Sequence, residues 1–418
     1  MLVAALAGCG GSGPHITRTR ARTAQQQPPP AAAVRPAFGI TEDNADLLWN
    51  PGASAPAAAA PFLGGRHELT ALHPRYVRLL VDWAALQPSA QTPPDLSGAV
   101  DGCARGVGPC GTYEGIAGAL AAIASQQRAA RAEGRPGFEV VVDVFGAPAW
   151  AALPPHGCEL AGASSFMRPL APAALGAYRN LIAALISLAR LKGVALPWWS
   201  AWNEPNDPRF LSPQRAGCDA HGTPLATAVY AQLARAMSAE LKQADPGAQM
   251  LLGELGGYDS GSAHRLSVEE FVAALPADVL CLSDTWAVHA YAAYGRRGPA
   301  ERDPVAALES ALDARGGCAT SARVWVTEAG AGAPDPGRAR TADAGEGRAG
   351  CLALAAQVLR WRADPRVAAV FQYEFRDDPA FPVGLASADL RSLEPTYRMW
   401  LALFGAGQAG SRASLCGG

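Results

Sequence analysis

Two glutamates, each placed where an apolar strand-like run ends, are the side chains of this 418-residue chain best suited to chemistry. Glu204 lies in residues 198–206, Trp-Trp-Ser-Ala-Trp-Asn-Glu-Pro-Asn, where Pro205 ends the strand because it has no backbone N–H to donate. Glu328 follows a second such run, Arg-Val-Trp-Val-Thr at residues 323–327. Two carboxyl groups facing one another are what cleavage of a glycosidic bond requires.

The surroundings of each glutamate predict different roles. The amide of Asn203 can hydrogen-bond a sugar hydroxyl beside Glu204, and we expect the nearby tryptophans to exclude water and raise the pKa of Glu204. This predicts Glu204 as the acid/base; the tryptophans are Trp198, Trp199 and Trp202. Glu328 is predicted to be the ionised nucleophile, with Arg78 and Tyr291 as hydrogen-bond donors.

Plainer interpretations remain open at this stage. A buried glutamate at a strand end can simply pair with an arginine, although two such glutamates, one in Asn-Glu-Pro, favour a site. Arg78 could belong to an ion pair that only stabilises the barrel. His289 could be a buried histidine that makes its hydrogen bonds within the core and does not contact substrate or Glu204. Asp143 and Glu254 are further acids at strand ends, which leaves a different carboxyl pair open.

Eight short apolar runs read as strands, and helical segments separate most of them. The predicted strands are residues 38–40, 76–83, 138–145, 197–202, 250–254, 285–291, 323–327 and 367–375. The predicted helices are residues 115–133, 172–192, 226–244, 304–315 and 346–363. Such alternation indicates parallel strands that are buried on both faces.

A closed (β/α)8 barrel fits this pattern better than an open doubly wound sheet. The open sheet normally has a glycine-rich phosphate turn after its first strand, and residues 38–41 offer none. In a barrel both glutamates lie on the C-terminal rim, where loops build active sites. We expect one catalytic domain over residues 37–410 and a short C-terminal tail over 411–418.

With these motifs, the chain resembles the clan A glycoside hydrolases, a retaining (β/α)8 group, over residues 38–404. The Trp-Asn-Glu-Pro-Asn run is similar to that of family 5 and family 39 members. The resemblance implies that Glu204 ends strand four as acid/base and that Glu328 ends strand seven as nucleophile. It also implies substrate-site roles for Arg78 on strand two and for His289 with Tyr291 near the end of strand six.

One feature departs from that family pattern. An aromatic residue, usually tryptophan, often ends strand eight as a platform for sugar. This chain has Phe-Gln-Tyr-Glu-Phe-Arg at residues 371–376, so Tyr373 or Phe375 is the candidate. We take Tyr373 as the substrate-binding residue.

The composition and the N-terminus predict an exported protein. Residues 6–9, Leu-Ala-Gly-Cys, resemble the lipobox before the acylated cysteine of bacterial lipoproteins, so residues 1–9 read as a signal remnant with Cys9 as lipid anchor. Residues 10–36, with Gln-Gln-Gln-Pro-Pro-Pro at their centre, read as a disordered tether. A disordered N-terminus in a cytosolic protein is the alternative. We expect no other stretch to be long and apolar enough to cross a bilayer.

Eight further cysteines, an even number, favour disulfides in an oxidising compartment. Cys103 with Cys110 is the best local pair; the other connectivities stay open. A metal site is disfavoured because no Cys-x-x-Cys pair occurs and the histidines are scattered. No cofactor is expected, and a net charge of −2, with no basic block beside aromatic residues in the folded part, argues against nucleic acid.

The sequence therefore predicts a monomeric retaining glycosidase acting on a β-linked glycoside or polysaccharide. A surface carbohydrate-binding protein whose hydrolytic activity has decayed is one alternative. A transglycosylase on the same barrel is another. Sugar identity and exo or endo action depend on loops that the pattern does not predict.

Overall fold

The computed structural model describes residues 35–42, 60–98, 100–101, 112–113, 115–292, 302–332, 344–404 and 412–417. All structural statements below concern these residues. The predicted lipid-anchor residue Cys9, nearly all of the predicted tether 10–36, and the predicted pair Cys103 and Cys110 lie outside them.

Parallel strands form a barrel, as the sequence predicts. Each strand pairs in parallel with its neighbours in the sheet. In sheet order they are β7 (Gln249–Met250), β6 (Trp198–Ser200), β5 (Glu139–Phe145), β2 (Tyr76–Asp82), β1 (Ala37–Thr41), β11 (Val367–Tyr373), β10 (Arg323–Ala329), β9 (Thr285–His289) and β8 (Leu252–Leu255).

The fifth predicted strand is broken in two, and its two pieces close the barrel. Only Leu251 separates β7 from β8; β7 pairs with β6, and β8 pairs with β9. The N–H of Leu251 still donates to the carbonyl of Trp199 at 2.8 Å, so the ladder continues across the break. The nine segments therefore occupy the eight positions of a (β/α)8 barrel.

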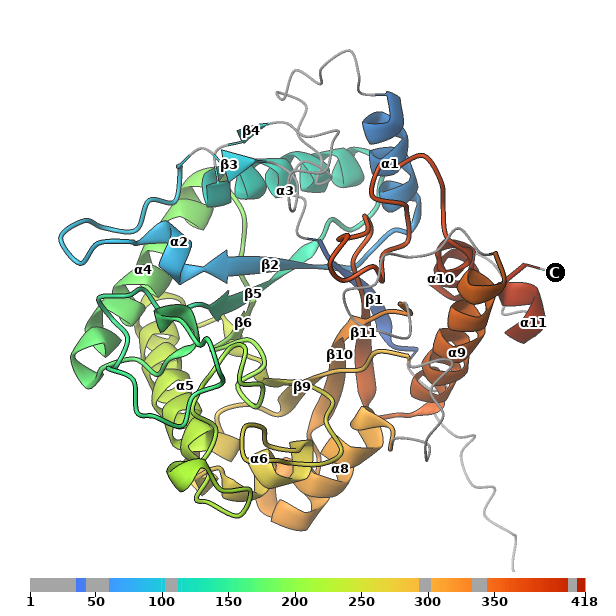
Figure 1. Ribbon diagram of the computed structural model, residues 1–418. Coiled ribbons are helices and arrows are strands. Elements are labelled where there is room, and N and C mark those ends of the chain that lie inside the picture. The colour runs from blue at the N-terminus through green and yellow to red at the C-terminus, as the bar shows by residue number, and fades with distance from the viewer. Residues whose placement is uncertain are drawn as a thin grey trace, which may run out of the picture. The chain divides into compact units, whose positions relative to one another are not determined.

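Helices surround the strands (Figure 1). The longer ones are α1 (Ala60–Ala71), α3 (Gly115–Ala132), α4 (Leu175–Lys192), α5 (Leu225–Ala244), α6 (Val268–Ala274), α8 (Pro304–Arg315), α9 (Ala344–Ala363) and α10 (Pro395–Phe404). Short helices α2 (Trp83–Leu86), α7 (Ala277–Leu280) and α11 (Arg412–Leu415) and the antiparallel pair β3 (Val100–Asp101) and β4 (Thr112–Tyr113) lie in the connections. Helices α1, α6 and α10 have no counterpart among the predicted ones.

One helix corrects an expectation about membranes. Residues Pro172–Lys192, which include α4, have a mean hydropathy of 1.3 and are long and apolar enough to cross a bilayer by length and composition. The helix instead packs one face into the protein core, with Tyr178 and Leu181 among its fully buried residues. It ends at Gly193, whose φ of 72° gives the left-handed cap that favours glycine.

Alternate residues of each strand face opposite sides of the barrel wall. The outward residues, such as Val77, Val142 and Val326, join the large core between strands and helices. The inward residues at the lower level form a separate apolar cluster inside the barrel. Its members are Val141, Trp198, Leu251, Ala287, Trp325, Ala369 and Phe371, with Tyr76 packed against them.

Aromatic rings fill this interior cluster. The Trp325 ring lies 4.6 Å from the rings of both Tyr76 and Trp198, measured between centroids, and Phe371 stacks on Tyr76 at 5.7 Å. Gly39 leaves the space that this packing needs, because a Cβ at Gly39 would lie 2.5 Å from the Phe371 ring. The barrel is thus a packed core with a dry floor beneath its upper rim.

Three disulfides join the described cysteines: Cys158–Cys218, Cys281–Cys318 and Cys351–Cys416. The first joins the loop after β5 to the loop after β6, two neighbouring loops on the C-terminal side of the barrel. The last attaches α9 to the residue after α11. Disulfides of this kind persist in oxidising compartments, which agrees with the predicted extracytoplasmic location.

The aromatic floor makes Gly39 a sensitive position. We expect Gly39→Ala to destabilise the protein by about 1–3 kcal/mol, because the Phe371 ring must leave its place in a packed core. Urea unfolding monitored by circular dichroism measures this. Gly176→Ala is the matched control: this exposed helical glycine has open space around its Cβ position, so the change should be neutral or slightly stabilising. Equal effects of both changes would contradict the packing argument.

Candidate active site

Arg78 lies at the centre of the polar layer above the aromatic floor. It follows the inward-facing Tyr76 by two residues on β2, and only 1% of it is exposed. Its Nη2 donates to Asp143 at 2.9 Å, to Glu254 at 3.1 Å and to the amide oxygen of Asn203 at 2.7 Å. Its Nη1 donates to Glu328. One buried guanidinium therefore joins the ends of β2, β5, β8 and β10 and the loop after β6.

Glu254 on β8 lies beneath the rim and is fully buried. Hydroxyl groups of Ser200 and Thr327 donate to it at 2.7 and 2.6 Å, and Nε2 of His289 lies 2.9 Å away. Burial acts to raise the pKa of Glu254, but the charges of Arg78 and His289 and these hydrogen bonds lower it to about 2. Glu254 is therefore held by side chains of β2, β6, β9 and β10 and lies deeper in the barrel than Glu204 and Glu328, which are 7% and 8% exposed.

His289 at the end of β9 connects three glutamates. Its Nδ1 lies 2.7 Å from Oε1 of Glu204 and 3.4 Å from Oε2 of Glu328, while Nε2 faces Glu254. Burial acts to lower the pKa of His289, but Glu328, Glu204 and Glu254 raise it to about 10. A raised pKa and a carboxyl oxygen beside each ring nitrogen favour the imidazolium form, in which both nitrogens donate hydrogen bonds.

Glu204 lies just beyond β6, held by the strand next to it. Its N–H donates to the carbonyl of Glu254 at 2.9 Å, and its φ of 36° is uncommon for a residue with a side chain. Burial raises the pKa of Glu204, while the hydrogen bond from His289 acts to lower it. The net effect is a carboxyl group that retains its proton to higher pH than an exposed glutamate.

A β-bulge presents Glu328 to the site. The register of β10 with β9 runs regularly to Val326 and then shifts, so that Glu328 pairs with His289. The consecutive side chains of Thr327 and Glu328 consequently both reach the barrel interior, the first toward Glu254 and the second toward Arg78. The hydroxyl of Tyr291 donates to the other Glu328 oxygen.

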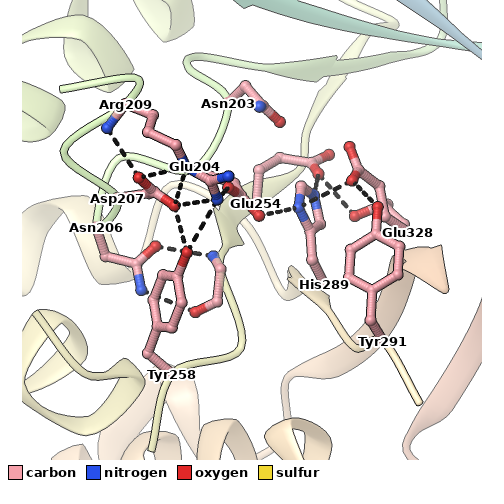
Figure 2. A network of polar contacts seen from close by, with 12 residues as sticks. Asn203, Glu204, Asn206, Asp207, Arg209, Glu254, Tyr258, His289, Tyr291 and Glu328 are labelled. Carbon is pink, nitrogen blue, oxygen red and sulfur yellow. Dashed lines mark hydrogen bonds and ion pairs between the residues drawn. The ribbon is translucent and has the colours of Figure 1, made fainter. Parts of the chain in front are cut away.

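The two rim glutamates face one another across His289 (Figure 2). One carboxyl oxygen of Glu204 and one of Glu328 lie within 4.8 Å of each other and of a His289 nitrogen. Glu204 is 7% exposed and Glu328 8%, so both side chains are largely removed from solvent.

The charges of this cluster balance when two of its carboxyl groups are protonated. Arg78 and His289 supply two positive charges to four carboxyl groups. Burial raises the pKa of Asp143 well above its ordinary value despite the opposing effect of Arg78, and burial raises that of Glu204 as well. These are the two carboxyl groups of the cluster whose pKa burial raises.

The same three atoms of Glu204, His289 and Glu328 have a spacing that could hold a metal ion. In this structure Nδ1 of His289 is hydrogen-bonded to Glu204.

Aromatic side chains border the Glu328 side. Tyr291, Tyr373 and Phe381 are half-buried, with ring centroids 4.9–6.3 Å apart. Tyr373 therefore lies beside a residue that contacts Glu328, whereas the other candidate, Phe375, is fully buried and packs against Tyr397. Phe381, from the loop after β11, was not anticipated, because it belongs to no strand.

The three tryptophans expected around Glu204 divide between different surroundings. Trp198 belongs to the aromatic floor, and Trp199 faces outward, where its indole N–H donates to the carbonyl of Leu196. Successive strand residues face opposite sides, so these two do not share a surface. Trp202, beyond the strand, donates to the carbonyl of Phe210. Burial is the largest cause of the raised pKa of Glu204.

Sequence reasoning also missed a polar group on the far side of Glu204. Asp207 accepts hydrogen bonds from the side chains of Arg209 and Tyr258, and Nη2 of Arg209 lies 3.7 Å from Oε2 of Glu204. Asn206 braces the same loop, since its amide bonds both backbone groups of Gly256. Asn206 and Arg209 directly follow Glu204-Pro205 in the sequence, and this run of polar residues could have indicated the group. Tyr258 comes from a distant loop, so its part in the group could not be predicted.

The sequence itself matches no protein-family model and no curated protein. Solved structures do share its fold. They include the endo-beta1,6-glucanase BT3312 (12% identity, TM-score 0.54, covering 90% of this chain and 79% of that one). A monomeric beta-xylosidase from Caulobacter crescentus CB15 matches with 15% identity and a TM-score of 0.54, over 89% and 68%. GH5_18 from Streptomyces cattleya, solved with GlcNAc, matches with 16% identity and a TM-score of 0.51, over 91% and 82%.

These likenesses establish the fold. The chain has a (β/α)8 barrel like those of these solved glycoside hydrolases, so the predicted fold is confirmed. At such low identity the activity must be argued from the site itself.

The lowered pKa of Glu254 predicts a pH-dependent contribution to stability. Because the folded-state pKa is about 2 and an unfolded glutamate titrates near ~4.3, the contribution is fully present above about pH 5 and is lost as pH falls toward 2. We expect Glu254→Gln to cost about 3–5 kcal/mol at neutral pH. The difference from the wild type should shrink in urea unfolding between pH 5 and 3.

Glu139→Gln is the control, because Glu139 pairs with Arg75 and both side chains are partly exposed. Its loss should be below about 1 kcal/mol. A Glu254→Gln difference that stays constant over the same pH range would show that the carboxylate is not held ionised by its neighbours.

Proposed function

We propose that the protein is a retaining glycoside hydrolase that cleaves a β-linked glycoside by double displacement. The observation that carries this is the separation of less than 4.8 Å between carboxyl oxygens of Glu204 and Glu328. Retaining enzymes place their carboxyl groups ~5 Å apart, whereas inverting enzymes need ~6.5–9.5 Å to admit a water.

In the first displacement Glu328 attacks the anomeric carbon while Glu204 gives its proton to the departing oxygen. Burial raises the pKa of Glu204, which favours the protonated form that this step needs. Arg78 and Tyr291 each donate to one oxygen of Glu328, which orients its carboxylate toward the substrate. The C–O bond to the leaving group breaks as the bond to Glu328 forms.

In the second displacement the ionised Glu204 removes a proton from water. The water oxygen bonds to the anomeric carbon, and the bond to Glu328 breaks. His289 hydrogen-bonds Glu204 and lies 3.4 Å from Glu328, so its cation stabilises whichever glutamate bears the charge. Both carboxyl groups return to their starting protonation states.

The substrate-contacting residues in this proposal lie on the same rim. Asn203 is held by Arg78 next to Glu204, where its amide nitrogen can donate to a sugar hydroxyl. The half-buried rings of Tyr291, Tyr373 and Phe381 offer an apolar wall on the Glu328 side, suited to the face of a pyranose. The glucanase and xylosidase of similar fold support a carbohydrate as the substrate.

We further propose that the enzyme acts outside the cytoplasm, as a monomer attached through a lipid on Cys9. The three disulfides support export, the lipobox-like residues 6–9 support the anchor, and the similar xylosidase is monomeric. The domain boundaries 1–9, 10–36, 37–410 and 411–418 belong to the same proposal.

Substitution of the two glutamates separates their roles. Glu328→Gln should reduce turnover of aryl β-glycosides by at least about 10⁴-fold. Glu204→Ala should keep rapid glycosylation by a 2,4-dinitrophenyl β-glycoside, because this leaving group needs no acid. The variant should regain turnover when azide replaces water as the acceptor, because azide needs no base. Steady-state rates and the anomeric configuration of the azide product, followed by NMR, measure this.

Glu133→Gln, an exposed change of the same kind, controls for the substitution itself and should leave the rates unchanged. An equal, azide-insensitive loss in both active-site variants would refute the role assignment. Glycan binding without cleavage across β-glucosides, β-galactosides, β-mannosides, β-xylosides and polysaccharides would favour a binding protein.

A further inference from the structure

The two oxygens of Glu204 lie in different surroundings. Oε1 accepts the hydrogen bond from Nδ1 of His289 at 2.7 Å. Oε2 lies 3.7 Å from Nη2 of Arg209 across the loop. Under the proposed function, Oε2 is then the oxygen free to give its proton to the leaving group.

Hydrogen bonds to Asp207 and Tyr258 hold Arg209 in this position. Its Nε donates to both oxygens of Asp207 at 3.0–3.1 Å, and its Nη2 donates to Asp207 at 2.5 Å and to the hydroxyl of Tyr258 at 3.2 Å. The main chain fixes the same unit, because the N–H of Asp207 donates to the carbonyl of Glu204 at 2.8 Å. Figure 2 shows this group on the side of Glu204 opposite His289.

We propose that Arg209 is a positioning residue for proton cycling at Glu204: it stabilises the carboxylate that Glu204 becomes after protonating the leaving group. This inference rests on the proposed function. When the C–O bond to the leaving group breaks, the Glu204 proton moves to that oxygen, and Oε2 acquires charge beside the guanidinium. The charge persists until Glu204 takes a proton from the attacking water. Asp207 and Tyr258 keep Arg209 from closing on Glu204 as a permanent ion pair.

The other charged and titratable groups around Glu204 do not replace this role. They are Asp207 on its own loop, Tyr258 after β8, Glu254 on β8, His289 on β9, Tyr291 after β9 and Glu328 on β10. His289 is the one other cation among them, and it is shared with Glu254 and Glu328. Arg209 is the cation that faces Oε2.

The test compares Arg209→Gln with Arg209→Lys. Loss of a cation at this separation should raise the pKa of Glu204 by about half to one unit. The basic limb of kcat/KM for a 4-nitrophenyl β-glycoside should therefore move to higher pH by that amount. The acid limb of reactivation of a 2-fluoroglycosyl-enzyme, which needs ionised Glu204, should move the same way, and reactivation at neutral pH should slow roughly 3–10-fold. Arg209→Lys should keep both limbs within about 0.2 units of the wild type.

Two controls isolate the effect. Arg235→Gln breaks a comparable pair with Asp278 on the remote face of α5 and should move neither limb. Arg209→Gln leaves Asp207 without its arginine partner, so the double variant Asp207→Asn with Arg209→Gln removes that extra negative charge. In the double variant both pH limbs should still lie at higher pH than in the wild type. Circular dichroism checks that each variant is folded.

The outcomes separate this inference from the proposed function. A wild type that turns over no aryl β-glycoside and is not labelled at Glu328 by a 2-fluoroglycoside contradicts the proposed function. The role of Arg209 alone is contradicted if the wild type is labelled and active but Arg209→Gln leaves both pH profiles, of kcat/KM and of reactivation, where they were. A change in KM alone would contradict it as well.

Discussion

The buried guanidinium of Arg78 is the interaction on which the candidate site depends. It donates to side chains from β5, β8 and β10 and from the loop after β6, so one cation sets the positions of groups that are far apart in the chain. A buried cation is stable only with matching charge, and unpaired carboxylates at these positions would be costly. The second cation, His289, completes the balance. The fold and the protonation pattern of the site are therefore consequences of the same electrostatic requirement.

That requirement is met because the barrel separates apolar and polar layers. The aromatic floor of Tyr76, Trp198, Trp325 and Phe371 excludes water from below, and the polar layer begins two residues further along the strands. Low local polarity strengthens each hydrogen bond above the floor. It also favours protonated over ionised carboxyl groups, which is the state that the acid role proposed for Glu204 requires before the reaction starts.

Local departures from regular strand geometry supply the rest. The shift after Val326 directs Glu328 inward, and the break at Leu251 leads to Glu254, whose φ of 52° lies in the region that L-residues rarely adopt. Glu204 also has a positive φ. Such features are concentrated at functional sites, where surrounding contacts hold a conformation that the residue alone would not prefer. The similar solved structures share the barrel, while less than a fifth of their residues are identical to this chain.

The sequence by itself determined the barrel and its strands, because buried parallel strands and amphipathic helices leave periodic patterns that local reading detects. It also located Glu204 and Glu328, since a carboxyl group after an apolar run stands out. It could not determine which side of the barrel wall Trp198, Trp199 and Trp202 face, or that His289 lies between three glutamates. Nor could it determine that Arg209 contacts Tyr258. Those depend on strand register, on a bulge and on loops that meet only after folding. Charge balance and protonation are properties of groups brought together from the whole chain, so only the tertiary structure decided them.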